Sequence, residues 1–380
     1  MAPETQVRPV RIGAETGGHM RVMQVVDSLW AGGMESVAVN IGNALAEQDF
    51  DSHLCSTRVD GPLAASVYPS VKRLRLDRKG RFDVPAIRRF VAYNRQNRIE
   101  VLHAHGTAVF ISLITALFPP YPKVVWHVHT GSLATHGDRA GFYRLAGKRS
   151  RAVITVSRPL SDWCHNQLRI QSEKIQFIPN FIGRPPANQP PADLPGQPGF
   201  RIVCVGNLRP EKDHLTLLKA MKQVIKAHPQ AHLLMVGAVL DAAYHAQLNE
   251  EIQCNGLGAH VTWLGPRHDV ASILKACDVG VLSSAVEGLP MALLEYGIAG
   301  LATVTTRVGQ CAEVLGDGQC GALVTPGSPG ELAVAITRLL FSPGERNRLA
   351  AQFLTRVEAG YTAEAVIPRL RQVYDAVLAA

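Results

Sequence analysis

Short apolar runs and helical patterns alternate along most of the chain. A run rich in Val and Met occupies residues 21–27, and a glycine turn and a helical pattern at 35–46 follow it. Strand-like runs at 101–102, 123–129 and 152–156 continue this order of strand, turn and helix. Because such alternation implies parallel strands joined by helical crossovers, the first half of the chain is predicted to be a doubly wound α/β domain.

A second unit of the same kind is predicted in the other half. A passage rich in Pro and Gly at 179–199 breaks the periodicity, and strand character resumes at 201–206. Further strand-like runs, separated by helical segments, lie at 233–236, 261–264, 279–282, 302–305 and 322–324. The closing segment 362–379 has the pattern of an amphipathic helix.

The expected architecture is therefore two Rossmann-like doubly wound domains that face each other across a cleft. The N-terminal domain is expected at 21–183, a linker at 184–199 and the C-terminal domain at 200–361. The helix at 362–380 is expected to complete the N-terminal domain, and residues 1–20 are expected to be disordered or derived from a tag. Open α/β sheets bind ligands beyond the carboxyl ends of their strands, so the cleft is the expected site.

Composition supports a folded protein in a reducing compartment. The 380 residues are 47% hydrophobic and 18% charged, which is typical of globular domains. The longest apolar stretch, 108–118, is shorter than the roughly 18 residues of a membrane span and indicates a buried helix. Seven cysteines form no Cys-x-x-Cys pair, which disfavours a zinc site and a disulfide framework. The first twenty residues show no secretory signal, so a cytoplasmic location is expected.

The net charge of +8 suggests an anionic partner. A solvated basic helix face, an anionic membrane surface and a nucleic acid are the alternatives. The aromatic residues of a base-stacking platform are missing, so no nucleic-acid partner is expected. The basic residues concentrate in one segment of the N-terminal half: Lys72, Arg73, Arg75, Arg78, Lys79, Arg81, Arg88, Arg89, Arg95 and Arg98.

Two glutamates eight residues apart, Glu287 and Glu295, provide the most informative local pattern. A predicted strand at 279–284 precedes the first, and a predicted helix at 290–299, with Pro290 suited to its first turn, carries the second. Both carboxylates can therefore face one crevice and accept hydrogen bonds from sugar or ribose hydroxyls. The helix N-terminus between them offers free N–H groups to a phosphate.

This element resembles the donor motif of the family 4 retaining glycosyltransferases, which have the GT-B fold. Other segments similar to the family's motifs occur in its order at 27–35, 102–106, 125–129, 153–157, 178–180, 205–212 and 321–324. The resemblance implies transfer of a sugar, with retention of configuration, from a UDP- or GDP-sugar to a glycan or lipid-linked hydroxyl. It implies bacterial polysaccharide or glycolipid biosynthesis in the cytoplasm, with the inner face of the membrane as a peripheral contact. The nucleotide-sugar is a co-substrate, and no other cofactor is implied.

The resemblance also assigns roles to residues of the C-terminal half. Lys212 is the expected cation on the donor phosphates, Glu287 the ligand of sugar hydroxyls and Glu295 the ribose anchor. The family's usual arginine is Asn207 here, and Arg209 is the expected replacement. Further donor-binding residues are expected at Gly206, Arg267, Gly288, Leu289, Pro290 and Met291, the last three through backbone N–H groups.

The N-terminal half is expected to supply a histidine and the acceptor side. His129 is the expected site histidine and His127 the alternative, because both point the same way on an alternating strand. Gly33 is expected to approach the donor, and the acceptor-side residues are Gly32, Glu35 and His105. Each of these could instead be structural, in a tight turn or a buried core. Asp77, Asp83 and Asp138 form no close carboxylate pair, so no metal site is expected.

Two other functions fit the same architecture. A nucleotide-sugar 2-epimerase would consume its substrate without an acceptor, and a non-catalytic sugar-binding protein would explain the missing arginine at Asn207. A dinucleotide oxidoreductase is disfavoured because no Gly-x-Gly-x-x-Gly opens either domain.

Overall fold

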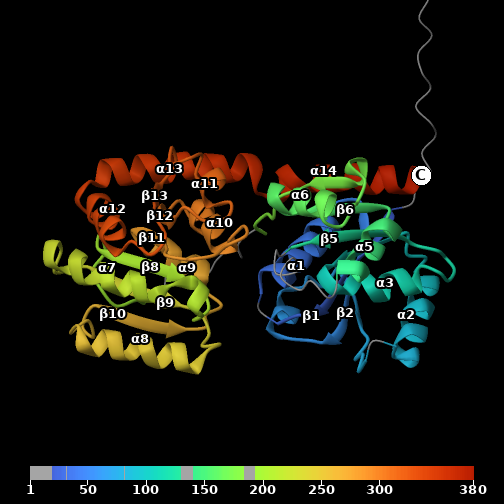
Figure 1. The fold of residues 1–380 in the computed structure, drawn as a ribbon, viewed down its shortest axis with the longest axis horizontal. Helices are drawn as coiled ribbons and strands as arrows, with labels where there is room; N and C mark the ends of the chain where they lie inside the picture. Colours follow the sequence, from blue (N-terminus) through green and yellow to red (C-terminus); the bar gives the residue numbers. More distant parts are fainter. Residues whose placement is uncertain (1–18, 31, 81, 130–139, 184–192) are drawn as a thin grey trace, which may run out of the picture.

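The structure is a computed structural model that describes residues 19–380, except 31, 81, 130–139 and 184–192. The segment 1–20, apart from its last two residues, and most of the predicted linker therefore lie outside the described residues. Figure 1 shows two α/β domains side by side, with α13 (Pro343–Gly360) over the C-terminal one and α14 (Ala363–Ala379) over the N-terminal one.

The N-terminal domain is built on a seven-stranded parallel sheet with the order β3-β2-β1-β4-β5-β6-β7. Its strands are β1 (Met20–Ser28), β2 (Phe50–Val59), β3 (Lys72–Arg75), β4 (Val101–His105), β5 (Lys123–Val128), β6 (Ala152–Thr155) and β7 (Ile175–Phe177). Its helices and 3-10 turns are α1 (Gly33–Ala46), η1 (Pro62–Ser66), α2 (Val84–Gln96), η2 (Gly106–Ala108), α3 (Val109–Thr115), α5 (Ala140–Arg149), α6 (Arg158–Asn166) and η4 (Ser172–Lys174).

The C-terminal domain has a six-stranded parallel sheet with the order β10-β9-β8-β11-β12-β13. Its strands are β8 (Arg201–Val205), β9 (His232–Val236), β10 (Val261–Gly265), β11 (Val279–Leu282), β12 (Ala302–Thr306) and β13 (Ala322–Val324). The other elements are η5 (Pro210–Lys212), α7 (His214–Ala227), α8 (Ala242–Cys254), α9 (Val270–Lys275), α10 (Met291–Ile298), α11 (Cys311–Val314) and α12 (Pro329–Phe341). The predicted doubly wound architecture of both halves is confirmed.

Short polar side chains start several of these helices. Asp83 accepts a hydrogen bond from the backbone N–H of Ala86 at 3.0 Å, and Asp241 accepts one from Tyr244 at 2.9 Å. Ser157 caps α6 in the same way. Each cap satisfies an N–H group that the first helical turn leaves without a partner, so the chain leaves its strands and turns into helices at defined residues.

Helices cover both faces of each sheet. In the N-terminal domain, α2, α3, α5 and α6 pack on one face, while α1 and α14 pack on the other. The final helix buries Ile367, Leu370 and Tyr374 in the latter core, and each fully buried aliphatic side chain contributes roughly 1.5–3 kcal/mol. The chain thus crosses between the domains twice, and the backbone N–H of Ile182 donates to Tyr361 O at 2.9 Å where the two crossings meet.

The basic segment differs from a solvated helix face. Its first part is the edge strand β3, where Lys72 pairs with Asp51 at 2.9 Å and Arg73 with Asp60 at 2.6 Å. Arg78 is buried and pairs with Asp27 at 3.0 Å. The helix-face interpretation is therefore wrong for residues 72–78, because they form a strand and the loop after it, and their basic side chains pair with nearby carboxylates.

Two other local expectations need correction. The apolar stretch 108–118 is helical only to Thr115, and Leu117 and Phe118 are 67% and 45% exposed instead of buried. Pro290 is the residue before α10, with an extended backbone, and not part of its first turn. No helix in the described part of the chain is long and apolar enough to cross a membrane.

Candidate active site

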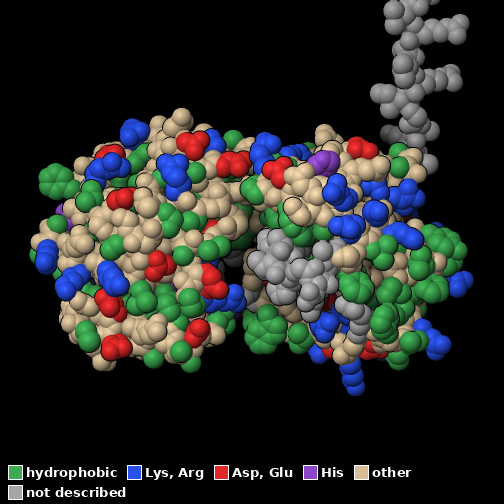
Figure 2. All heavy atoms as spheres, viewed as in Figure 1, with side chains coloured by type: hydrophobic (Ala, Val, Ile, Leu, Met, Phe, Trp, Pro, Cys, Tyr) green, Lys and Arg blue, Asp and Glu red, His purple; other side chains and the backbone are tan. Residues whose placement is uncertain are grey.

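The donor-side residues gather at the carboxyl ends of β8 and β11, on the C-terminal domain. Figure 2 shows the surface hollowed between the two domains. Lys212 ends the turn η5 that follows β8, and Asp213 after it adopts a left-handed backbone with φ of +47° and starts α7. Glu287 lies in the loop between β11 and α10. Parallel β8 and β11 are neighbours in the sheet, so residues that follow them meet at one edge.

Lys212 and Glu287 form a direct ion pair. Lys212 Nζ donates to Glu287 Oε1 at 2.5 Å, and the hydroxyl of Ser284 donates to the same oxygen at 2.7 Å. Ser283 Oγ donates to the backbone oxygen of Lys212 at 3.0 Å. The lysine side chain is 27% exposed and the glutamate 9%. The pair is therefore preorganised, with the cation open to a ligand and Glu287 Oε2 without a described hydrogen-bond partner.

The loop that carries Glu287 is held from behind by β12 and the turn after it. Thr306 Oγ1 donates to Ser284 O at 2.6 Å, and the N–H of Gln310 donates to Gly288 O at 2.9 Å. Gly309 has φ of +51°, and a Cβ there would collide with the backbone oxygens of Glu287 and Gly288. Glycine is needed because both the backbone angle and the close approach exclude a side chain.

The start of α10 has free N–H groups where a phosphate cradle is expected, with one correction. Pro290 has no backbone N–H, so it cannot donate as expected; Leu289 and Met291 can. No described group accepts from the N–H groups of Gly288, Leu289 or Met291. Leu289 is buried, while Met291 packs against the cores of both domains. These free donors and the positive end of the helix dipole favour an anion at this point.

Glu295 lies in the second turn of α10. Its carboxyl group has no described partner, and burial raises its pKa to about 7. The side chain keeps some exposure to solvent, so a ligand can reach it. A carboxylate that lacks partners in the ligand-free protein gains hydrogen bonds when ribose hydroxyls approach. This arrangement agrees with the predicted ribose anchor, which stays a prediction.

The residues at and near position 207, where the family usually has an arginine, make different contacts. Asn207 Oδ1 accepts from the N–H of Ala238 at 3.0 Å and so ties the loop after β8 to the loop after β9. Arg209 is exposed, and no described acidic group pairs with it. Gly206 donates its N–H to Val236 O at 2.8 Å. Arg267 is held by Asp269 through contacts of 2.7 and 2.5 Å, an arrangement that suits a surface arginine.

On the N-terminal domain, the acceptor-side residues surround the start of α1. Gly32 caps this helix, and a Cβ on it would collide with the Glu35 carboxylate, whereas Gly33 has open space around it. Burial, with Asp27 as a further cause, raises the pKa of Glu35. The sequence assigned no role to Asp27, which is the penultimate residue of β1 and accepts from the hydroxyls of Thr57 and Thr107, each at 2.5 Å. The only cue to Asp27 in the sequence is that a polar residue stands near the end of a predicted strand.

Four histidines form a buried cluster on one face of β4 and the end of β5. His105 Nδ1 lies 2.8 Å from His129 Nε2, and His103 Nε2 lies 3.0 Å from His127 Nδ1. Burial lowers the pKa of His129 to about 3 and the pKa of His127 well below its usual value, so both rings are neutral. His129 is 8% exposed and His127 1%. The structure thus favours the strand-end His129 as the one that a substrate can reach.

The same cluster is where metal-ligating groups come together in the described chain. Ring nitrogens of His103, His105 and His127 all lie within 4.8 Å of one another. The His103 and His127 rings are inclined by only 19° with centroids 5.0 Å apart, so the two nearest nitrogens point at each other across a hydrogen bond. A metal ion would need these lone pairs to converge instead.

Comparison with known proteins covers both domains. Residues 31–183 match the model of the Glycosyltransferase Family 4, and residues 191–353 match that of the Glycosyl transferases group 1. The chain is 24% identical over 319 residues to the UDP-Gal:alpha-D-GlcNAc-diphosphoundecaprenol alpha-1,3-galactosyltransferase of Escherichia coli, covering 76% of this chain and 79% of that protein. It is 22% identical to the N-acetyl-alpha-D-glucosaminyl L-malate synthase of Bacillus anthracis, over 91% and 94% of the two chains.

The fold is shared with a solved structure. Anabaena HepE, solved with UDP and glucose, superposes with a TM-score of 0.77 at 19% identity, covering 94% of this chain and all of that one (100%). The two family models together match most of both domains in the expected order. The chain therefore belongs to the family 4 glycosyltransferases.

Proposed function

We propose that the protein transfers a sugar from a UDP-sugar to a hydroxyl of a lipid-linked acceptor, with retention of configuration and without a metal ion. The observation that carries this proposal is the Lys212–Glu287 pair of 2.5 Å beside the free N-terminus of α10. One relative is named for UDP-Gal and a diphosphoundecaprenol acceptor, and a structural neighbour was solved with UDP. These names support UDP as the nucleotide, and the diphosphoundecaprenol of the first supports a lipid-linked acceptor, whereas the relative from Bacillus anthracis is named for the soluble acceptor L-malate.

The geometry suggests how the leaving group is stabilised. When the bond between the anomeric carbon and the diphosphate breaks, negative charge grows on the phosphate oxygen. Lys212 Nζ and the N–H groups at the start of α10 meet that charge in a preorganised arrangement. Arg209, exposed and near Lys212 in the chain, is the proposed second cation. The charge is thus balanced by the protein, and the proposal needs no metal.

Glu287 is better suited to binding than to covalent catalysis. Its Oε1 is already engaged by Lys212 and Ser284, which leaves Oε2 to accept from a sugar hydroxyl. A nucleophilic carboxylate must be free to approach the anomeric carbon, and this ion pair opposes that. We therefore propose attack from the same face: the acceptor oxygen bonds to the anomeric carbon while its proton passes to the departing diphosphate oxygen.

The finer proposal on location is peripheral contact with an anionic membrane through α5 and the end of α3. Phe142 and Leu145 on α5 are 50% and 53% exposed, and Leu117 beyond α3 is 67% exposed. The basic residues Lys148 and Arg149 are exposed on the same helix. Figure 2 shows hydrophobic and basic side chains adjoining on this domain. Apolar side chains mixed with basic ones favour the interface of an anionic bilayer.

Two experiments test these proposals. Thermal-shift measurements with UDP-, GDP- and ADP-sugars should show the largest stabilisation with a UDP-sugar, and a preference for GDP would contradict the donor assignment. NMR of the stabilising donor with enzyme alone should show no epimer, because an epimerase would need no acceptor.

For membrane contact, flotation with vesicles containing phosphatidylglycerol should recover the protein, and neutral phosphatidylcholine vesicles should not. The double substitution Leu117→Asp and Phe142→Asp should abolish recovery. Phe341→Asp is the matched control, since Phe341 is 78% exposed on the other domain. Equal flotation on both vesicle types would count against the proposal.

A further inference from the structure

A continuous chain of hydrogen bonds connects the core of the N-terminal domain to His129. Gln24 Oε1 lies 2.9 Å from His105 Nε2, and His105 Nδ1 lies 2.8 Å from His129 Nε2. Gln24 and His105 are fully buried at 0% exposure. The His105 and His129 rings are inclined by 26° with centroids 5.0 Å apart, so each facing nitrogen lies close to the plane of the other ring.

The direction of each hydrogen bond follows from the chemistry of its members. The amide oxygen of Gln24 can only accept, so His105 must carry its proton on Nε2. A neutral imidazole has one N–H, which makes His105 Nδ1 an acceptor and His129 Nε2 the donor to it. Burial holds the pKa of both rings far below neutrality, so neither ring carries a second proton. His129 Nδ1 is then left with a lone pair.

A second chain of bonds keeps the first in place. Tyr374 Oη of α14 lies 2.7 Å from His103 Nδ1, and His103 continues to His127. The His103 ring stacks on the His105 ring at 4.7 Å with an angle of 14°. Since Tyr374 and the stacked pair restrict rotation of the imidazoles, His105 cannot turn its nitrogens around without disturbing the core.

The last atom of the first hydrogen-bond chain, His129 Nδ1, lies at the edge of the sheet where ligands are expected to bind. His129 Nδ1 is buried, and no described group donates a hydrogen bond to it. A buried acceptor without a partner costs about 1–3 kcal/mol relative to a satisfied one in general, so such an atom calls for an explanation. His129 directly follows β5, and the carboxyl ends of parallel strands line the binding crevice.

We propose that Gln24 and His105 are positioning residues that hold His129 as the tautomer protonated on Nε2, so that the substrate group meeting Nδ1 is a hydroxyl. A lone pair accepts from a hydroxyl but repels a carboxylate or a phosphate oxygen. The site therefore selects donors with a free hydroxyl at the sugar position that faces His129 and rejects donors with an acidic group there. The substrate part of this inference rests on the proposed function, whereas the tautomer does not.

Nitrogen NMR of the full-length protein labelled with ¹⁵N-histidine tests the tautomer directly. The resonances that vanish in His129→Gln identify the ring, and they should show a proton on Nε2. A proton on Nδ1, which a rotated Gln24 amide would produce, overturns the proposal. The tautomer itself is measured on the wild-type protein, and His129→Gln serves only to assign the resonances.

Gln24→Leu removes the accepting oxygen and should allow both His129 tautomers, while Gln24→Glu retains an acceptor and should preserve the wild-type tautomer. Asn94→Leu is the matched control, because Asn94 is a buried amide of the same domain without described side-chain partners. It should leave His129 unchanged. An unchanged tautomer in Gln24→Leu, or an equal change in Asn94→Leu, would refute the positioning role.

Kinetics with UDP-glucose and UDP-galactose connect the tautomer to the substrate. Gln24→Leu should lower kcat/KM for the accepted donor roughly tenfold, the effect of one hydrogen bond, and Gln24→Glu should recover most of it. For one monodeoxy analogue of that donor, Gln24→Leu should cause no further loss, because the hydroxyl is already missing. Additive losses for every analogue would overturn the substrate part. If no UDP-sugar reacts, the proposed function fails while the NMR result stands.

Discussion

Replacing Lys212 of the Lys212–Glu287 pair with alanine is expected to lower the stability of the protein slightly and its kcat strongly. In Lys212→Ala, Glu287 loses a partner at 2.5 Å but keeps the hydroxyl of Ser284 at 2.7 Å. Because the lysine is 27% exposed, water can replace part of the lost interaction. The expected cost is therefore that of one charged hydrogen bond, about 1–3 kcal/mol. For a domain of this size the melting temperature should fall by roughly 2–12 °C.

The expected loss of activity is much larger than this instability can cause. A protein with a stability of about 5 kcal/mol that loses 3 kcal/mol is still more than roughly 95% folded at 25 °C. Loss of one preorganised charge on the leaving diphosphate, by contrast, should lower kcat about 10²–10³-fold, as for the loss of an oxyanion-hole donor. The two effects can be distinguished by measuring both on the same preparation.

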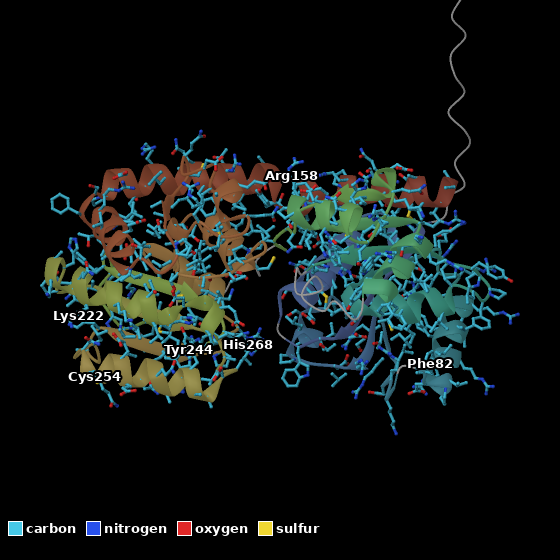
Figure 3. All side chains as sticks on the ribbon, in the orientation of Figure 1. Phe82, Arg158, Lys222, Tyr244, Cys254 and His268 are labelled. Atoms are coloured by element: carbon cyan, nitrogen blue, oxygen red, sulfur yellow. The ribbon has the colours of Figure 1, made fainter. Side chains whose placement is uncertain are left out.

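The assay is single-turnover transfer or hydrolysis of a saturating UDP-sugar, with melting followed by circular dichroism. Lys222→Ala is the matched control: Lys222 lies on α7 and donates to Asn255 Oδ1 at 2.8 Å. Figure 3 places Lys222 on the side of the C-terminal domain away from the N-terminal domain. This control should keep wild-type kcat. If Lys212→Ala retained kcat within threefold of the wild type, the role of Lys212 in stabilising the leaving group would be refuted.

Two further predictions concern the same loop and helix. Burial raises the pKa of Glu295 from 4.5 to about 7, so the folded protein binds the carboxyl proton more tightly than the unfolded chain does. The free energy of unfolding should therefore fall by at most about 3 kcal/mol as the pH rises from 4.5 to 7. Glu295→Gln should remove this pH dependence of stability, as measured by urea titrations. The same variant should weaken UDP binding in calorimetry at pH 8, and an unchanged affinity would contradict the ribose role. Gly309→Ala should lower kcat/KM at least roughly tenfold and stability by about 1–3 kcal/mol, through strain and collision with the Glu287 loop. Gly330→Ala, with open space at its Cβ, is the control, and equal behaviour of the two variants would argue against the collision.

The periodic pattern predicted most strands but missed three in the N-terminal domain. One is β2, where polar side chains interrupt the apolar run although the strand is buried, and the other two are short edge strands. β3 has the sequence Lys-Arg-Leu-Arg, and its charges conceal any apolar alternation. They are tolerated because an edge strand has one neighbour, and charges there also prevent pairing with other chains. β7 is only three residues long, too short for a period to show. The alternation carries information only where a strand is buried on at least one face.

The candidate site shows a similar division. The strand-turn-helix pattern around Glu287 was readable because it is local. Its partner Lys212 is 75 residues away, and only the resemblance to a family suggested that they act together. The histidine alternation predicted that His127 and His129 share a face. Gln24, which is proposed to orient His129 through His105, is 81 residues from His105. Hydrogen-bond direction depends on such distant partners and has no periodic signature.

The substitution at Asn207 follows from its neighbours. Its Oδ1 accepts from Ala238 at 3.0 Å, and next to it Gly237, with φ of +153°, packs directly on the backbone of Gly206 and Asn207. An arginine side chain directed at a phosphate could not make that contact. The short amide therefore stabilises the loop after β8, from which Arg209 and Lys212 extend. Since position 207 contributes no charge, we expect Lys212 and the proposed second cation Arg209 to share the stabilisation of the diphosphate, and both extend from the loop that Asn207 fixes.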